Sequence, residues 1–244
     1  FSFFNKSLIS NKGSQFRSDN HRLSYHNLNK YKLIYNADIL LCTWYDDTTA
    51  SYANITSNIN KMYCDKYGYE FVADHTRRVP ELARIWEKIP LIQELMEKYP
   101  HKYIMWMDAE VYFNKKAQYT IENVINPNKD KDFIFSEGIL ENPINTGVFI
   151  IKSNNYTKKM LEYFMTYVNK PCEKYESKDQ CAITSTYLEN KKYIQIRSDV
   201  IPYGILQYFR KYNKSKESLL VNLSGLDDGT KVSIVKTLEE SLLQ

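Results

Sequence analysis

Short apolar runs alternate along this chain with longer stretches in which apolar residues recur at helical spacing. The segment "DILLCT" (38–43) predicts a buried strand. Residues 52–63 then place Tyr, Ile and Met side chains on one helical face, and Gly68 predicts the end of that helix. Residues 69–73 return to strand composition. The pattern therefore predicts a strand, a helix and a second strand, beginning near residue 38.

The same alternation continues towards the C-terminus. A helical stretch over 81–98 contains Pro90, which predicts a kink or a break. Further strands are predicted over 102–107, 132–136, 146–152, 193–196 and 219–223, and further helices over 155–168, 178–189 and 231–243. Strands that alternate with helices favour an α/β fold with a largely parallel sheet. In such sheets, ligands bind beyond the carboxyl ends of the strands.

Residues 1–32 differ from the rest of the chain. They are polar, rich in Asn, Ser and Lys, and show no sustained periodicity, so we expect a flexible stem or arm. The remaining residues, 33–244, have the length of one domain with a sizeable core.

Composition and charge exclude some classes of protein. The formal net charge is only +4 and no dense Lys/Arg block occurs, so a dedicated nucleic-acid binder is not expected. None of the four cysteines forms a C-x-x-C pair, which argues against a zinc site. Cys42 lies in an apolar run and is expected to be a core thiol, whereas Cys172 and Cys181 flank a charged loop and can form a disulfide in an oxidising compartment.

The cellular location stays open between two alternatives. The chain begins at Phe1 rather than methionine, so a signal or membrane anchor could have been removed from it. If an N-terminal anchor was removed, we expect the protein in the Golgi or another secretory lumen. Five N-x-[ST] sequons weakly favour that location. Without such an anchor the protein would be cytoplasmic.

The segment "KYIMWMDAEVYF" (102–113) carries the most informative chemistry. It places Asp108 and Glu110 at the end of an apolar strand, where ionised carboxylates need compensation by lysines, water or a divalent cation. Residues i and i+2 of an extended chain point the same way, so the two carboxylates can converge. Mg²⁺ and Mn²⁺ prefer such oxygen ligands. An acid pair at a solvated strand end, partnered by lysines, fits the same pattern.

The surroundings of this pair resemble the family 34 glycosyltransferases. That family includes fungal α-1,2-galactosyltransferases, mannosyltransferase subunits and plant xyloglucan xylosyltransferases. The residues of segment 84–113 in register with its pattern are Trp86, Lys88, Pro90, Pro100 and Trp106. "NTGVFIIKS" (145–153), "KDQCAITSTYL" (178–188) and "VIPYGILQYF" (200–209) resemble its later segments in the expected order. The resemblance spans roughly residues 38–226.

The resemblance implies a GT-A fold, a nucleotide-binding α/β sandwich. It implies transfer of a sugar from a nucleotide-diphosphate sugar to a glycan or glycoprotein acceptor, with retention of anomeric configuration. A UDP-hexose or UDP-pentose is the expected donor, ahead of a GDP-sugar. The implied cofactor is Mn²⁺ or Mg²⁺, which stabilises the diphosphate leaving group.

The resemblance also implies roles for particular residues. The metal ligands would be Asp108, Glu110 and Asn222, and the catalytic residues beyond the anomeric carbon would be Asp179 and Gln180. The donor and acceptor would be bound by Thr43, Tyr45, Arg84, Lys88, Asp108, Asn145, Thr146, Gly147 and Lys231. Asp179 and Gln180 also fit an ordinary helix start with Ser177 as its N-cap.

Three positions depart from the family pattern. Glu110 stands where the family has Asp, Asn222 stands at its histidine, and Asp227 stands at the lysine that meets the diphosphate. Lys231, four residues on, can supply the missing positive charge. These departures motivate an alternative, a non-catalytic GT-A-like subunit that binds glycan or a partner transferase. Homo- and hetero-oligomers are both compatible with this sequence.

Overall fold

A computed structural model describes most of the chain beyond residue 37. The described residues are 38–139, 142–168, 172, 177–189, 191–212 and 217–243. The stem or arm predicted over 1–32 lies outside them. The described residues form one compact unit.

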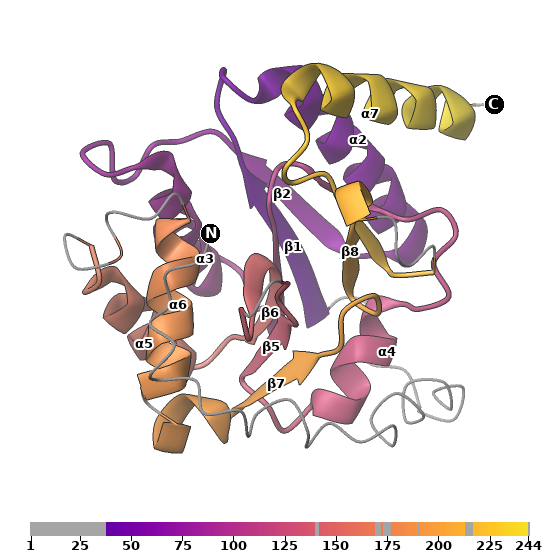
Figure 1. Cartoon of the computed structure of the whole chain (residues 1–244). Helices are drawn as coiled ribbons and strands as arrows, with labels where there is room; N and C mark the ends of the chain where they lie inside the picture. The colour runs from indigo at the N-terminus through magenta and orange to yellow at the C-terminus, as the bar shows by residue number, and fades with distance from the viewer. Residues whose placement is uncertain are drawn as a thin grey trace. The chain divides into compact units, whose positions relative to one another are not determined.

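The centre of the fold is a six-stranded sheet with the strand order β2-β1-β3-β6-β5-β7 (Figure 1). Its strands are β1 (Ile39–Trp44), β2 (Glu70–Asp74), β3 (Tyr103–Met107), β5 (Phe133–Ser136), β6 (Asn145–Lys152) and β7 (Ser198–Ile201). β6 pairs antiparallel with both of its neighbours, whereas the other three pairings are parallel. β6 alone therefore runs against the other five strands, and the largely parallel sheet is confirmed.

A smaller second sheet lies beside the first. It has the order β4-β9-β8 and consists of β4 (Val111–Phe113), β8 (Gln207–Phe209) and β9 (Leu220–Asn222). β4 follows β3 after only three residues, so the chain passes from the large sheet to the small one at Asp108–Glu110. The predicted carboxylate pair thus lies at the junction of the two sheets.

Helices cover the sheets on two sides. They are α2 (Ala50–Tyr67), α3 (Lys88–Lys98), α4 (Ile121–Ile125), α5 (Asn155–Met165), α6 (Lys178–Glu189) and α7 (Asp228–Leu243), with the short turns η3 (Arg84–Glu87), η4 (Asn126–Asn128), η6 (Lys191–Gln195) and η7 (Arg210–Tyr212). Figure 1 shows α3, α5 and α6 on one side of the large sheet and α2 and α7 on the other.

Two hydrophobic cores match this layering. The larger one packs side chains of β1, β3, β5 and β6 against α3, α5 and α6. The other packs α2 and α7 against the small sheet. β1 and β3 are buried at every position, which explains why they are continuous apolar runs rather than alternating ones. Cys42 is fully buried in β1, so the predicted core thiol is confirmed.

The predicted helix over 81–98 is divided as Pro90 indicated. A 3-10 turn, η3, precedes α3, and Pro90 is the third residue of α3. At that position a helical N–H has no partner within the helix, so proline is tolerated. Gly68 ends α2 with a φ of 76°, a left-handed conformation that glycine adopts without strain.

The strand predicted over 193–196 is wrong. Residues 191–195 form a π-helical turn, η6, and Tyr193 and Ile196 are 62% and 66% exposed. The strand begins later, at Ser198, and pairs with β5. The apolar side chains of 193–196 suggested burial, but the sheet edge is completed by the more polar segment that follows. β4 and β8 were not predicted because three-residue strands carry little periodicity.

One buried asparagine connects α2 to the small sheet. The Asn60 side chain donates to the Val111 carbonyl at 2.8 Å and accepts from the Phe113 N–H at 3.1 Å. The predicted apolar face of this helix is only partly correct, since Met62 is 41% exposed while Asn60 is 2% exposed. A polar side chain belongs there because it faces backbone groups of β4.

We expect Asn60→Ala to lower the free energy of unfolding by about 2–3 kcal/mol, because it leaves a buried carbonyl and a buried N–H without partners. Urea denaturation followed by circular dichroism measures this. Asn58→Ala, on the exposed face of the same helix, is the matched control and should change stability by less than about 0.5 kcal/mol. Equal effects of the two substitutions would contradict the role given to Asn60.

Candidate active site

The carboxylate pair lies in a turn rather than in extended chain. The N–H of Val111 donates to the carbonyl of Asp108 at 2.9 Å, and β4 starts immediately afterwards. The N–H of Asp108 donates to the carbonyl of Gly147 at 2.8 Å, which ties the turn to β6. The expectation that Asp108 and Glu110 point the same way from an extended strand is therefore wrong. Each carboxylate has its own lysine.

Asp108 is held by two donors. Its Oδ1 accepts from the indole N–H of Trp106 at 2.8 Å and from Lys88 at 3.2 Å. The side chain is still 36% exposed, so Asp108 can be reached by a ligand. Partial removal of the carboxyl group from water, opposed by Lys88 and reinforced by Asp179 and Glu110, raises the pKa of Asp108 to about 6.

Lys88 lies beneath Asp108 and is 3% exposed. Its ammonium is 2.5 Å from Asp179 Oδ2, 3.2 Å from Asp108 Oδ1 and 3.2 Å from the carbonyl of Thr146. Burial opposes its charge, but the two carboxylates outweigh that effect and raise the pKa of Lys88. An ammonium has three N–H donors, and these three acceptors use them all. Lys88 therefore connects β3, β6 and α6.

The two predicted catalytic residues differ in their exposure. Asp179 is 1% exposed, and Thr146 donates to its Oδ2 at 3.1 Å. Its Oδ1 has no hydrogen-bond partner among the described residues. Gln180 is half-buried, and its carbonyl oxygen accepts from Asn145 at 3.0 Å and from the Thr146 N–H at 3.3 Å. Asp179 is thus the buried counterion of Lys88, and Gln180 lies nearer the surface.

A chain of side-chain amides runs from α6 through β6 to the small sheet. Asn145 donates to Gln180, Gln207 donates to Asn145 at 2.8 Å, and Asn222 donates to Gln207 at 3.0 Å. The carbonyl oxygen of Asn222 accepts from the Ser224 N–H at 2.8 Å. Each amide fixes the orientation of the next. Gln207 was not predicted. The sequence does carry a signal for it, because this polar residue stands within the apolar run "GILQYF", and the structure buries it fully.

Gly147 is surrounded by these polar side chains. A Cβ atom placed on it would lie 3.0 Å from Asp108 Oδ2, 3.0 Å from Asn145 Oδ1 and 3.1 Å from Asn222 Nδ2. Three predicted site residues from β3, β6 and β9 thus converge where a side chain is absent. We call this group, Asp108, Asn145, Gly147 and Asn222, the Gly147 cluster.

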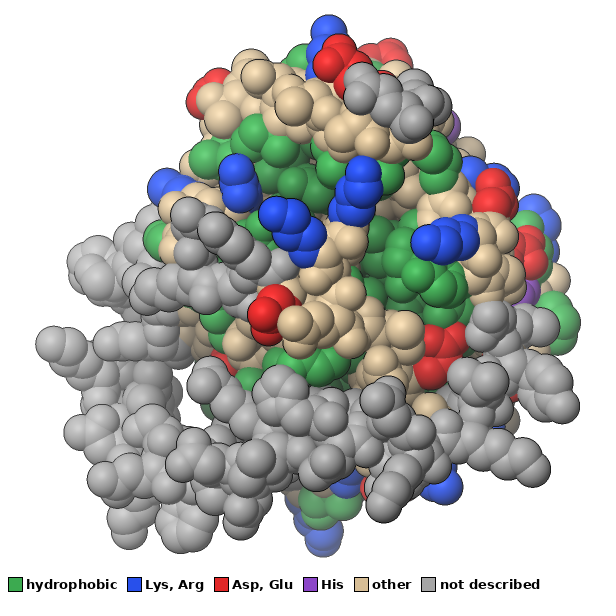
Figure 2. Space-filling model, turned by 90° about the vertical axis from the view of Figure 1, so that its right-hand side faces the viewer, with side chains coloured by type: hydrophobic (Ala, Val, Ile, Leu, Met, Phe, Trp, Pro, Cys, Tyr) green, Lys and Arg blue, Asp and Glu red, His purple; other side chains and the backbone are tan. Residues whose placement is uncertain are grey.

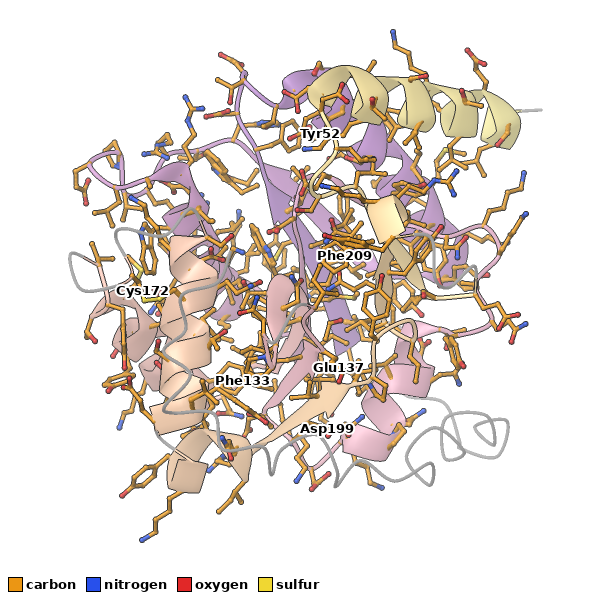
Figure 3. The ribbon with its side chains drawn as sticks, in the orientation of Figure 1. Tyr52, Phe133, Glu137, Cys172, Asp199 and Phe209 are labelled. Carbon is orange, nitrogen blue, oxygen red and sulfur yellow. A yellow bond between two sulfur atoms is a disulfide. The ribbon has the colours of Figure 1, made fainter. Side chains whose placement is uncertain are left out.

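Glu110 points to the other side of the turn. Its Oε2 is 2.6 Å from the ammonium of Lys231, which comes from the first turn of α7. The same ammonium lies 4.7 Å from the centre of the Tyr52 ring, and Tyr52 lies on α2 beneath α7 (Figure 3). Burial opposes the charge on Lys231, but Glu110 outweighs that effect and raises its pKa.

Asp227, at the position of the family lysine, directly precedes α7. Its carboxylate accepts from the N–H of Thr230 at 2.9 Å and from the Thr230 hydroxyl at 2.6 Å. These hydrogen bonds lower the pKa of Asp227. An aspartate at a helix start is favoured by the N–H groups there, so the substitution has a local structural role.

As the side chains lie, the three predicted metal ligands do not form a metal site. Asp108 and Glu110 are each paired with a lysine, and Asn222 directs its NH₂ group, not its oxygen, towards Gly147. Within the described ranges, no three His, Cys, Asp or Glu side chains are grouped to hold a metal ion. The residues present therefore do not fit a bound divalent ion in this arrangement.

The predicted nucleotide contacts at the end of β1 are buried, with Thr43 inside the strand and Tyr45 directly after it. Thr43 and Tyr45 are 2% and 5% exposed, and the Tyr45 hydroxyl donates to Asn54 at 2.9 Å. Arg84 is different, because its side chain is 57% exposed and forms an ion pair with Asp46 at 2.6 Å. The structure thus groups the residues around Gly147, whereas Thr43 and Tyr45 are buried elsewhere on the chain at the end of β1.

α6 is anchored at its start by a disulfide. Cys181, which follows Gln180, is bonded to Cys172. The bond lies beside Trp86, which is 1% exposed, in a small hydrophobic cluster. The start of α6, which carries Asp179 and Gln180, is therefore fixed against η3.

Part of the chain matches a known protein family. Residues 33–133 match the galactosyl transferase GMA12/MNN10 family. This part of the chain is similar to the family 34 glycosyltransferases. The matched segment ends at Phe133, so the Asn-Thr-Gly strand, α6 and the small sheet follow it.

Individual relatives are distant. An uncharacterised alpha-1,2-galactosyltransferase of Schizosaccharomyces pombe is 23% identical over 225 residues, covering 72% of this chain and 63% of that protein. A probable xyloglucan 6-xylosyltransferase of Arabidopsis thaliana is 31% identical over 112 residues, covering 42% of this chain and 24% of that protein. The chain thus spans less than two thirds of the length of these curated relatives.

Solved structures confirm the GT-A fold. A glycosyltransferase involved in glycosylation of the major capsid of PBCV-1 aligns with a TM-score of 0.66 at 18% identity, covering 82% of this chain and 98% of that one. The galactosyltransferase LgtC, in complex with donor and acceptor sugar analogs, aligns with a TM-score of 0.51 at 9% identity, covering 83% and 95%. None of the described helices is long and apolar enough to cross a membrane.

We expect Gly147→Ala to lower the free energy of unfolding by about 1–3 kcal/mol, because the added methyl group would press on three polar side chains that are held in place. Thermal and urea denaturation measure the loss. Gly229→Ala in the exposed first turn of α7 is the matched control, with an expected change under about 1 kcal/mol. Unchanged stability of Gly147→Ala would show that the cluster is loosely packed.

Proposed function

We propose that this protein transfers a sugar from a nucleotide-diphosphate sugar to a glycan acceptor, with retention of anomeric configuration. The observation that carries the proposal is the Gly147 cluster, in which residues of β3, β6 and β9 meet at the junction of the two sheets. The GT-A fold and the family 34 relatives support the same reading.

The donor is proposed to be a UDP-hexose or UDP-pentose. Relatives named as galactosyl- and xylosyltransferases support a hexose or a pentose. Asn145 and Gln180, joined by a hydrogen bond, would bind sugar hydroxyls with amide groups that can both donate and accept. Gly147, without a side chain, would let the donor approach the backbone of β6 closely.

Asp108 is the carboxylate best placed to contact the donor. It is the exposed member of the group around Lys88, whereas Asp179 is buried. Asp179 would act by holding Lys88, whose positive charge lies behind Asp108 and Thr146. Gln180 would lie beside the anomeric carbon, and its amide oxygen would stabilise the partial positive charge that develops on that carbon during transfer.

Divalent metal assistance remains a prediction. The family resemblance motivates it, whereas the lysine partners of Asp108 and Glu110 weigh against a metal in the arrangement seen. The side-chain oxygen of Asn222 also weighs against a metal, because it accepts from the Ser224 N–H.

We expect Asp108→Asn to lower the transfer rate about 100-fold or more, because it removes a charge that contacts the donor while keeping the side-chain shape. Release of UDP from UDP-galactose, UDP-glucose and UDP-xylose, and of GDP from GDP-mannose, measures the rate. NMR of the product then reports the anomeric configuration. Asp130→Asn, an exposed aspartate on the surface, is the control and should retain full activity. Full activity in Asp108→Asn would contradict the site.

A non-catalytic GT-A-like subunit is the second candidate. The ion pairs that occupy both carboxylates, together with Asn222 and Asp227 at the family's histidine and lysine positions, favour it. Such a subunit would bind a glycan or a partner transferase and release no nucleotide from any of the four donors. Glycan binding without any nucleotide binding would support this candidate over the first.

A further inference from the structure

The lysine next to Glu110 occupies an unusual position. Lys231 lies in the first turn of α7, where the helix dipole disfavours a cation, and its side chain is only 9% exposed. Glu110 at 2.6 Å and the face of the Tyr52 ring at 4.7 Å compensate the ammonium. Asp228 lies further away, at 3.6 Å, and is 62% exposed. The fold thus keeps a positive charge beside the second acid of the D-x-E turn.

A second ammonium lies close to the same loop. Gly225, with φ of 80°, has the side chain of Lys211 across it, and a Cβ there would lie 3.3 Å from Lys211 Cδ and 3.6 Å from Nζ. Lys211 comes from η7, which follows β8. The loop that lacks the family lysine at Asp227 is therefore approached by lysines from two other elements. Figure 2 shows Lys and Arg side chains gathered on the upper half of one face, with hydrophobic side chains between them.

We propose that the ammonium of Lys231, held by Glu110 and assisted by Lys211, supplies the positive charge at the donor diphosphate in place of a divalent metal ion. This inference rests on the proposed use of a nucleotide-diphosphate donor. Its class of ligand is the diphosphate of a nucleoside diphosphate or nucleotide sugar.

The hydrogen-bond partners of Lys88 and Lys231 explain why we assign the diphosphate to Lys231 and not to Lys88. Lys88 has acceptors for all three of its N–H groups, from Asp179, Asp108 and Thr146, so it has none left for a ligand. The closest acceptor of Lys231 is Glu110, and its next carboxylate, Asp228, is exposed. A phosphate oxygen can take the place of Asp228 without uncovering a buried carboxylate.

A metal at the same place would require two rearrangements. It would have to displace Lys231 from Glu110, and Asn222 would have to turn its oxygen inwards, away from the Ser224 N–H that it accepts from at 2.8 Å. It would also break the hydrogen bond from Asn222 to Gln207. The arrangement of side chains therefore favours the ammonium.

The test is calorimetric titration of the full chain with UDP, and separately with GDP, in EDTA and in Mn²⁺. The native protein should bind equally well, within about threefold, in both conditions. Lys231→Met, which keeps the stem and removes the charge, should weaken binding in EDTA about tenfold or more, and Lys231→Arg should recover part of it. Lys236→Met, on the exposed face of α7, is the matched control. Circular dichroism and the melting temperature verify that each variant is folded.

A double variant separates the loss of a cation from the exposure of an acid. In Lys231→Met, Glu110 loses its partner and could repel the diphosphate. Lys231→Met with Glu110→Gln removes both charges, and it should bind as weakly as Lys231→Met if the ammonium itself contacts the phosphate. Restored binding in the double variant would overturn the inference.

The remaining outcomes of the titrations also test the inference. Binding that requires Mn²⁺, or that is unchanged in Lys231→Met, would overturn the inference and leave the proposed transferase function standing. Absence of UDP and GDP binding by the folded native protein, with and without Mn²⁺, would overturn both.

Discussion

The buried ammonium of Lys88 is the interaction on which the geometry of the site depends. It joins the end of β3, the start of β6 and the start of α6 through Asp108, Thr146 and Asp179. A charge that is 3% exposed is tolerated only with such partners, so the three elements cannot separate without leaving it uncompensated. Asp108 and Gln180 are both held at the start of β6 as a result, since the Asp108 N–H donates to the Gly147 carbonyl and Gln180 accepts from the Thr146 N–H.

A second set of polar contacts connects the two sheets. The amide chain from Gln180 to Asn222 crosses from α6 through β6 to β8 and β9. The disulfide at Cys181 then fixes the start of α6 from its other side. The residues proposed to bind the donor sugar, Asn145 and Gln180, are therefore held in fixed positions. Its charge is provided by lysines that reach it from α3 and α7, on opposite sides of the Asp108–Glu110 turn.

Much of the fold could be predicted from the sequence because central strands such as β1 and β3 are buried on both faces. Runs such as residues 38–43 and 102–107 are apolar throughout, and Gly68 and Pro90 mark helix boundaries by backbone chemistry alone. The prediction failed at 193–196, where the apolar side chains of Tyr193 and Ile196 are exposed. It also missed β4 and β8, whose three residues are too few for a pattern. It also missed Gln207, which acts only through amides from other elements.

The sequence by itself determined that two carboxylates would end a buried strand and would need compensation. It also determined which later segments accompany them, because Asn145–Gly147 and Asp179–Gln180 stand in the order of the family pattern. Only the tertiary structure decided what compensates each acid. Lys88 precedes Asp108 by 20 residues and Lys231 follows Glu110 by 121, and only the packing of α3 and α7 brings them within hydrogen-bond distance. The energy of a buried charge depends on its neighbours in space, and those neighbours come from distant parts of the chain.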